Sequence, residues 1–248
     1  MDKINYEKIF EGAKTLLIKF SDVLISVHNW YERNAKNIEK YLLVFSGFST
    51  FCAAIDTLAE KQIIFTDDLT LEFANEICDS DEIDALVGRY YFDNNKQKMK
   101  ILIERCRSAK EIASYKELFS QIIDAYYREH YYLACVGMFS LIDGVLADTS
   151  QMIDATSFNK RISAIEKKIS DKVDLNDFDR KTLCIYTSME KIKETMFGNS
   201  DFKETEPSYL NRHWIIHGRT RKSYSEYDFL KTVLCLDAIS YMTQLTYK

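Results

Sequence analysis

Glu129–Ala147, with the sequence EHYYLACVGMFSLIDGVLA, is the stretch that decides the fold of this chain. It has the length of a helix, and Asp143 is the one acid embedded in its apolar interior. A helix that is apolar on all sides is normally buried. We therefore expect it to lie at the centre of a helical core.

The chain contains very few turn residues. It has one proline and seven glycines in 248 residues, whereas average usage would give roughly 12 and 17. Strand-rich folds need many turns, and turns use glycine and proline. The hydrophobic content of 46% and the charged content of 29% allow a buried core. We therefore predict an all-α protein, a helical bundle with additional N-terminal helices.

Apolar periodicity and helix caps place the helices in two regions. Residues 1–110 are predicted to form an N-terminal helical region of unknown role, and residues 111–248 a second helical domain. Pro207 fits the first turn of a helix that would run to His217, with Gly218 as its C-terminal stop. The other helices are expected at about 3–31, 37–62, 95–107, 109–128, 158–170, 177–197 and 225–246.

Cysteine usage and apolar runs exclude several classes of protein. None of the six cysteines forms a C-x-x-C pair, and most lie in apolar helical patterns, which argues against a zinc site. Buried reduced thiols suit a cytoplasmic protein. The N-terminus has no signal-peptide pattern, and the longest apolar run, 41–55, is shorter than a membrane span of about 20 residues. We expect a cytoplasmic protein without a cofactor, a metal or a membrane contact.

Residues 211–222, NRHWIIHGRTRK, form a candidate anion site. They hold two of the four histidines and four cations (Arg212, Arg219, Arg221 and Lys222), with no acid, in a chain whose net charge is -5. Imidazoles move protons near neutral pH, and a guanidinium binds phosphate through two parallel hydrogen bonds. The acidic net charge argues against broad, tight nucleic-acid binding and fits a local basic groove.

Arg212 and His217 are separated by four residues, in a spacing that suits RNA cleavage. The histidine can deprotonate a ribose 2′-hydroxyl or protonate a 5′-oxygen leaving group, and the arginine can stabilise charge on the phosphate. This reaction needs no metal and leaves a 2′,3′-cyclic phosphate. Residues five apart on a helix point about 140° apart. The two side chains therefore converge only if the helix ends near His217, or if two copies meet at a two-fold axis.

These residues and their surroundings resemble the HEPN superfamily. NRHWIIHG, at 211–218, is similar to its ribonuclease motif, and YYREHYYLACVGMFSLIDGVLAD, at 126–148, is similar to its central helix. The resemblance covers roughly residues 115–248. It implies a bundle of four or five helices that forms a homodimer and cleaves RNA without a metal. Such proteins serve as toxins or in abortive-infection and antiphage defence, so an antitoxin or an activator is an implied partner.

The resemblance also assigns roles to individual residues. Arg212 and His217 would be catalytic, and His213 matches the polar position beside the arginine. Asn211 and Asp143 would support them, Asp143 by orienting Arg212 or a histidine. The alternative is structural, with His217 capping a helix end and Arg212 paired with an acid.

The residues after the motif are candidates for RNA contact. Arg219, Arg221 and Lys222 are expected to contact phosphates, and Tyr224 is expected to stack on a base. The alternatives are a solvated loop and a packing tyrosine. Some toxins of the family carry a tyrosine two residues after the histidine, where a partner enzyme attaches a nucleotide. This sequence has Arg219 there, which argues against control by that route.

Two other functions compete with the enzyme. A non-catalytic binding or regulatory module of the same fold would keep the bundle without the chemistry. A nucleotide sensor would bind an activator through its N-terminal region. The enzyme requires the side chains of Arg212 and His217 to line one exposed groove.

Overall fold

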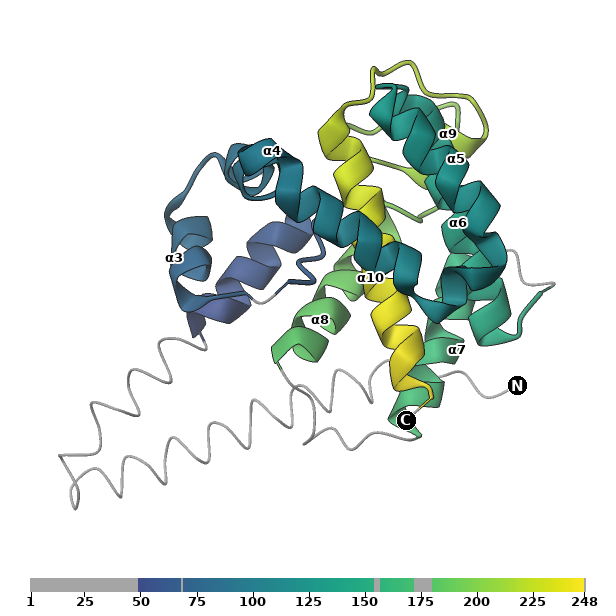
Figure 1. Ribbon diagram of the computed structural model, residues 1–248, viewed down its shortest axis with the longest axis horizontal. Helices are drawn as coiled ribbons and strands as arrows, with labels where there is room; N and C mark the ends of the chain where they lie inside the picture. The colour runs from purple at the N-terminus through teal and green to yellow at the C-terminus, as the bar shows by residue number, and fades with distance from the viewer. Residues whose placement is uncertain (1–48, 68, 154–156, 172–179, 248) are drawn as a thin grey trace. The chain divides into compact units, whose positions relative to one another are not determined.

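A computed structural model of the chain describes residues 49–67, 69–153, 157–171 and 180–247 (Figure 1). Within these ranges all regular structure is helical and no strand occurs, so the all-α prediction is confirmed. The helix predicted at 3–31 lies outside the described residues. Of the helix predicted at 37–62, residues 49–62 are described, and 49–60 are helical. The further elements are α3 (Leu71–Asp79), α4 (Ile83–Ser108), the 3-10 helix η1 (Lys110–Tyr115), α5 (Lys116–Tyr127), α6 (Tyr131–Ser150), α7 (Phe158–Ser170), α8 (Arg180–Thr195), α9 (Arg212–Ile216) and α10 (Glu226–Leu245).

Helix α6, which contains most of the stretch quoted first, lies at the centre of the core. It packs against α5, α7, α9 and α10. This explains why apolar residues are needed on all sides of it. By length and composition α6 could also cross a membrane, and half of its most apolar window is buried inside the protein.

Two glycines allow α6 to approach its neighbours closely. A Cβ atom added at Gly137 would lie 2.6 Å from Cγ1 of Ile122 on α5. A Cβ atom added at Gly144 would lie 2.8 Å from the ring of Tyr115 at the end of η1. Larger residues at either position would push these elements apart, so the glycines set the spacing between α6 and the segment before it.

Helix α10 forms the other half of the core and packs against α4, α6 and α7. It begins with a capping box in which the Ser225 hydroxyl accepts the Asp228 N–H at 3.3 Å and the Asp228 carboxylate accepts the Ser225 N–H at 2.9 Å. Arg105 of α4 donates two hydrogen bonds to Asp237 of α10, at 2.8 and 2.7 Å. The bidentate pair joins elements on both sides of residue 110, and a domain boundary there stays a prediction.

Several predicted helices are confirmed, but their bounds or helix type differ from the prediction. In α4 the backbone leaves the helical conformation at Asp93–Lys96, which separates the stretch predicted at 95–107 from the residues before it. Asn94 and Asn95 there have φ values of 51° and 57°, and asparagine tolerates this region better than most residues. The helix predicted at 109–128 begins as η1 and continues as α5.

Candidate functional site

The predicted helix from Pro207 to His217 is wrong, because only Arg212–Ile216 is helical. Asn211 is the N-cap, and its side-chain oxygen accepts the Trp214 N–H at 3.2 Å. The side-chain amide of the same residue donates to the carbonyl oxygens of Thr195 and Gly198, at 2.9 and 3.1 Å. Asn211 is 3% exposed. It therefore supports the motif by fixing the start of α9 to the end of α8.

Gly218 ends α9, as predicted. Its φ is 63°, its N–H donates to Ile215 O at 3.1 Å, and the Arg219 N–H donates to Trp214 O at 3.0 Å. These two bonds form a Schellman motif, which needs a left-handed residue after the C-cap. His217 is that C-cap residue and is exposed. The helix thus ends at His217, which is the first of the two conditions for bringing it near Arg212.

The two imidazoles of the motif meet at this helix end. The ring centroids of His213 and His217 lie 4.7 Å apart, in an edge-to-face arrangement. Phe202, from the loop after α8, stacks on His213 at 4.5 Å and lies 5.6 Å from His217. The Arg219 guanidinium lies 5.2 Å from the centre of the same phenyl ring. Phe202 also lies 5.3 Å from Trp214, so it contacts four residues of 211–222, although nothing in the local sequence singles it out.

His213 is held in one tautomer when it is neutral. Its Nδ1 accepts the Ser200 N–H at 3.1 Å, so in the neutral ring the proton is on Nε2. Burial lowers the pKa of His213, and the charges of His217 and Arg212 lower it further. Neutral His213 is thus a hydrogen-bond donor through Nε2 at neutral pH.

Arg212 points to α6 and pairs with Asp143. Its Nη2 donates to an oxygen of the Asp143 carboxylate, and its side chain is 17% exposed. Arg161 of α7 shares this acid, since its Nη1 lies 3.6 Å from the carboxylate and 3.3 Å from the Asp143 carbonyl oxygen. Of the two partners expected for Asp143, the structure pairs it with the arginine. Two guanidinium groups on one carboxylate leave a formal charge of +1.

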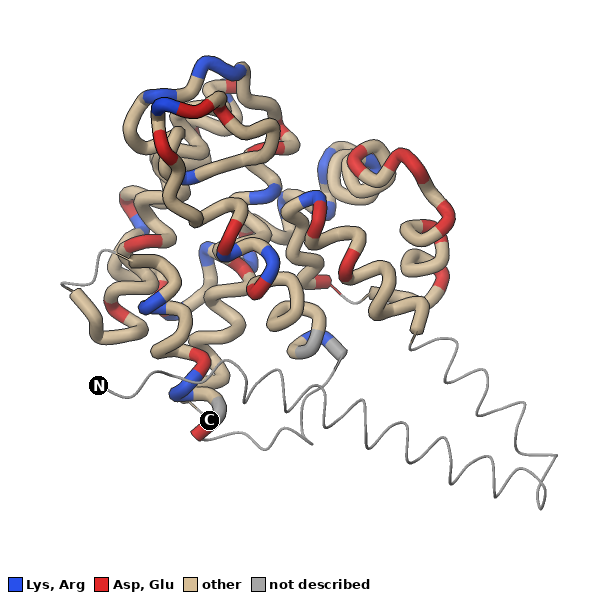
Figure 2. The backbone as a smooth tube through the Cα atoms, turned by 180° about the vertical axis from the view of Figure 1, so that it is seen from behind, with Lys and Arg blue, Asp and Glu red and all other residues tan. Residues whose placement is uncertain are grey.

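The cations after the motif lie on the surface. Arg219, Arg221 and Lys222 are exposed, and Figure 2 shows the basic loop between α9 and α10 at the top of the view. The Lys222 ammonium donates to Tyr209 O at 3.4 Å. Acids are close by, because the Glu206 carboxylate accepts the Arg221 N–H at 2.8 Å.

Tyr224 is half-buried and shapes the end of this loop. Its hydroxyl donates to the Thr220 hydroxyl at 2.9 Å, and its ring lies 5.4 Å from that of Tyr132 on α6. Burial raises the pKa of Tyr224 to about 12. Tyr132 in turn donates to Ile215 O of α9 at 3.1 Å. Tyr224 therefore takes part in packing, and its predicted contact with a base stays a prediction.

The structure thus brings His213 and His217 together, anchors Arg212 on α6, and leaves the three loop cations in solvent. Among the described residues, no three His, Cys, Asp or Glu side chains gather in a way that could hold a metal ion. Comparisons with protein-family profiles, curated proteins and solved structures find no match to this chain.

Proposed function

We propose that this protein is an endoribonuclease that cleaves RNA by attack of a ribose 2′-hydroxyl on the neighbouring phosphate, without a metal. The observation that carries the proposal is the pair of imidazoles, 4.7 Å apart, at the exposed end of α9. Proton-transfer groups on the surface beside exposed cations suit a polyanionic substrate that also needs acid–base chemistry. The resemblance to HEPN ribonucleases adds the role of a toxin or antiphage-defence effector.

His217 is the proton-transfer group in this proposal. It is exposed, and it takes the proton of the 2′-hydroxyl as the O2′–P bond forms. The P–O5′ bond breaks on the opposite side of the phosphorus, and the leaving 5′-oxygen takes a proton there. One imidazole cannot serve both sides of an in-line displacement. A homodimer, in which His217 of the second copy supplies that proton, meets the requirement.

Neutral His213 assists through its Nε2 proton. Because Ser200 occupies Nδ1, Nε2–H is the atom that can donate to His217 or to a phosphate oxygen. The lowered pKa of His213 favours its neutral form. The imidazoles therefore differ in role, because one is fixed by the backbone and the other is exposed.

Arg212 stabilises the charge on the phosphate from a fixed position. Asp143 holds its Nη2, and Arg161 shares that carboxylate, so the cluster keeps a formal charge of +1 for an anion. A guanidinium that is already oriented loses less entropy on binding phosphate than a free one. Asp143 is thus a positioning residue.

The alternative is a non-catalytic binding or regulatory module of the same fold. One observation favours it: Arg212 is paired with an acid and its side chain is mostly buried. In that case the arginine would only join α9 to α6, and no RNA would be cut.

Cleavage assays with matched variants distinguish the ribonuclease from the non-catalytic module. Purified protein is incubated with tRNA, rRNA and mRNA in EDTA, and the product ends are identified. His217→Ala and Arg212→Ala are each expected to reduce cleavage at least about 100-fold. Arg107→Ala, which removes an exposed arginine paired with Glu104, is expected to cut normally. Full activity of His217→Ala would overturn the proposal.

A further inference from the structure

A shallow, open hollow lies beside the motif. Its volume is about 390 Å³, at the small end of the range of about 300–1,000 Å³ for ligand pockets. Two segments line it that are far apart in the sequence: residues 129–133, where α6 begins, and residues 222–224, where the loop before α10 ends.

The middle of the hollow is aromatic and apolar. Tyr131, Tyr132 and Tyr224 line it, together with Leu133, whose exposed fraction is 59%. The rings of Tyr132 and Tyr224 lie 5.4 Å apart, and Tyr131 lies beside Glu129 at one end of the hollow. Accessible aromatic rings bind nucleobases, because every base has a face that can stack.

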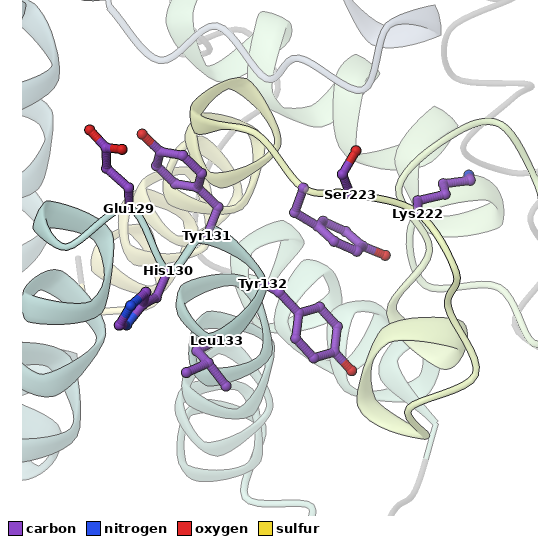
Figure 3. A pocket seen from close by; sticks show the side chains of 8 residues that line it. Glu129, His130, Tyr131, Tyr132, Leu133, Lys222 and Ser223 are labelled. Atoms are coloured by element: carbon purple, nitrogen blue, oxygen red, sulfur yellow. The ribbon is translucent and has the colours of Figure 1, made fainter.

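The two ends of the hollow carry opposite charges. Figure 3 shows the Glu129 carboxylate at one end and the Lys222 ammonium at the other, with Tyr131 and Tyr132 between them. A carboxylate accepts hydrogen bonds from the exocyclic amino group of a base and repels phosphate. An ammonium attracts phosphate. The charges therefore fix the direction in which a nucleotide can lie.

The hollow is joined to the candidate site by direct contacts. Tyr132 donates its hydroxyl proton to Ile215 O of α9 at 3.1 Å, so one wall is attached to the helix that carries the motif. Lys222, at the phosphate end, belongs to the same loop as the exposed cations Arg219 and Arg221. A strand whose base enters the hollow would therefore place its backbone along the basic loop.

We propose that the hollow binds one base of single-stranded RNA, stacked on Tyr131 and Tyr132, with its amino group on Glu129 and its phosphate on Lys222. The inference rests on the proposed function, because it names a subsite for the same substrate. It assigns Glu129 the choice of base: cytosine, adenine and guanine present an amino group, and uracil does not.

Binding is tested in the His217→Ala protein, so that RNA stays intact, by fluorescence anisotropy with labelled penta-cytidylate and penta-uridylate. Tyr131→Ala is expected to weaken binding of penta-cytidylate at least about 5-fold, and Tyr131→Phe, which keeps the ring, is expected to preserve it. The matched control is Tyr127→Ala, an exposed tyrosine (58%) that does not line the hollow. The thermal melting of each variant shows that it is folded.

The charged ends are tested in the same assay. Lys222→Ala is expected to weaken binding of both RNAs and to lower the salt dependence by about one phosphate contact, whereas Lys100→Ala, an exposed lysine of α4, is expected to have no effect. Glu129→Ala is expected to remove the preference for penta-cytidylate over penta-uridylate. If the His217→Ala protein with Glu129 intact binds penta-cytidylate and penta-uridylate equally, the role of Glu129 is overturned.

The subsite and the ribonuclease can fail separately. If Tyr131→Ala and Tyr127→Ala bind RNA equally, or if no RNA binds, the subsite is refuted, even where the protein with His217 intact cuts RNA. If binding depends on Tyr131 and the protein with His217 intact cuts nothing in EDTA, the subsite stands and the ribonuclease proposal fails.

Discussion

Removal of the Asp143 carboxylate is the perturbation whose cost follows most directly from the structure. Asp143 holds Arg212 of α9 and Arg161 of α7. In Asp143→Ala both guanidinium groups lose their acid and are left near each other. The exposed fractions of the three side chains are 17% for Arg212, 9% for Arg161 and 27% for Asp143. The cluster is therefore mostly, but not fully, removed from water.

These exposed fractions place the stability cost of Asp143→Ala between two limits. Breaking a buried ion pair by removing one partner costs about 3–5 kcal/mol, whereas exposed pairs contribute about 0–1 kcal/mol. For partly buried groups we expect Asp143→Ala to lower the free energy of unfolding by about 2–3 kcal/mol. In a protein of this size that corresponds to a fall in Tm of about 4–12 °C. Arg212→Leu leaves Asp143 paired with Arg161 and is expected to cost about 1 kcal/mol.

The assay is urea unfolding followed by circular dichroism, with Asp124→Ala as the matched control. Asp124 pairs with Arg128 at 3.0 Å on the surface, where both side chains are more than 60% exposed, so its removal is expected to change stability by less than about 0.5 kcal/mol. The double variant Asp143→Ala/Arg212→Leu is expected to be more stable than the sum of the single changes predicts, by about 1 kcal/mol or more. If Asp143→Ala costs no more than Asp124→Ala, or if the double variant is additive, the shared carboxylate does not hold the two arginines as described.

Three further predictions concern the helix end, the histidine pair and the centre of the core. Gly218→Ala should lower the free energy of unfolding in urea by about 1 kcal/mol. The φ of Gly218 is 63° and a Cβ atom there meets nothing within 4 Å, so the cost comes from the backbone conformation alone. Gly218→Asn should cost less, and equal costs for the two variants would contradict a backbone origin. Phe202→Ala should raise the pKa of His213 toward 6.5 in an NMR titration, because it exposes the ring. The pKa of His213 is lower in the folded protein than in the unfolded chain, so the unfolded chain binds more protons just below pH 6.5. The stability that His213 contributes should therefore fall as the pH drops below 6.5. This fall should be smaller in Phe202→Ala. Gly137→Ala should destabilise the protein by about 1–3 kcal/mol in urea unfolding, and Ile122→Ala should offset part of this loss if the close approach of α5 and α6 is its cause.

The all-α fold could be predicted because its causes are local. Few prolines and glycines leave long helices, and an apolar stretch such as 129–147 favours a position in the core. Gly218 was also predictable, since a left-handed residue after a helix C-cap is a local requirement. The capping box at Ser225 belongs to the same class of signal.

The helix predicted to start at Pro207 failed because distant groups bind the backbone there. The Gln62 side chain accepts the Leu210 N–H and donates to Leu210 O, both at 2.8 Å, and the Arg212 N–H donates to Met196 O at 2.7 Å. These bonds replace those a helix would make. Nothing near Pro207 in the sequence indicates them.

Only the part of the candidate site that depends on local spacing could be predicted. The spacing of His213 and His217 places them on one face of a helix, and their rings do meet. Phe202 joins them from a loop whose path is set by contacts such as Ser200 N–H to His213 Nδ1, which local sequence does not encode. From the sequence, Asp143 was expected to orient either Arg212 or a histidine. The packing of α9 on α6 pairs it with Arg212.

The most direct test of the central claim is end-group analysis of RNA incubated in EDTA with the protein and with His217→Ala. We expect 2′,3′-cyclic phosphate and 5′-hydroxyl ends from the parent protein and none from the variant. Cleavage that requires a divalent metal, or the same cleavage by His217→Ala, would contradict it.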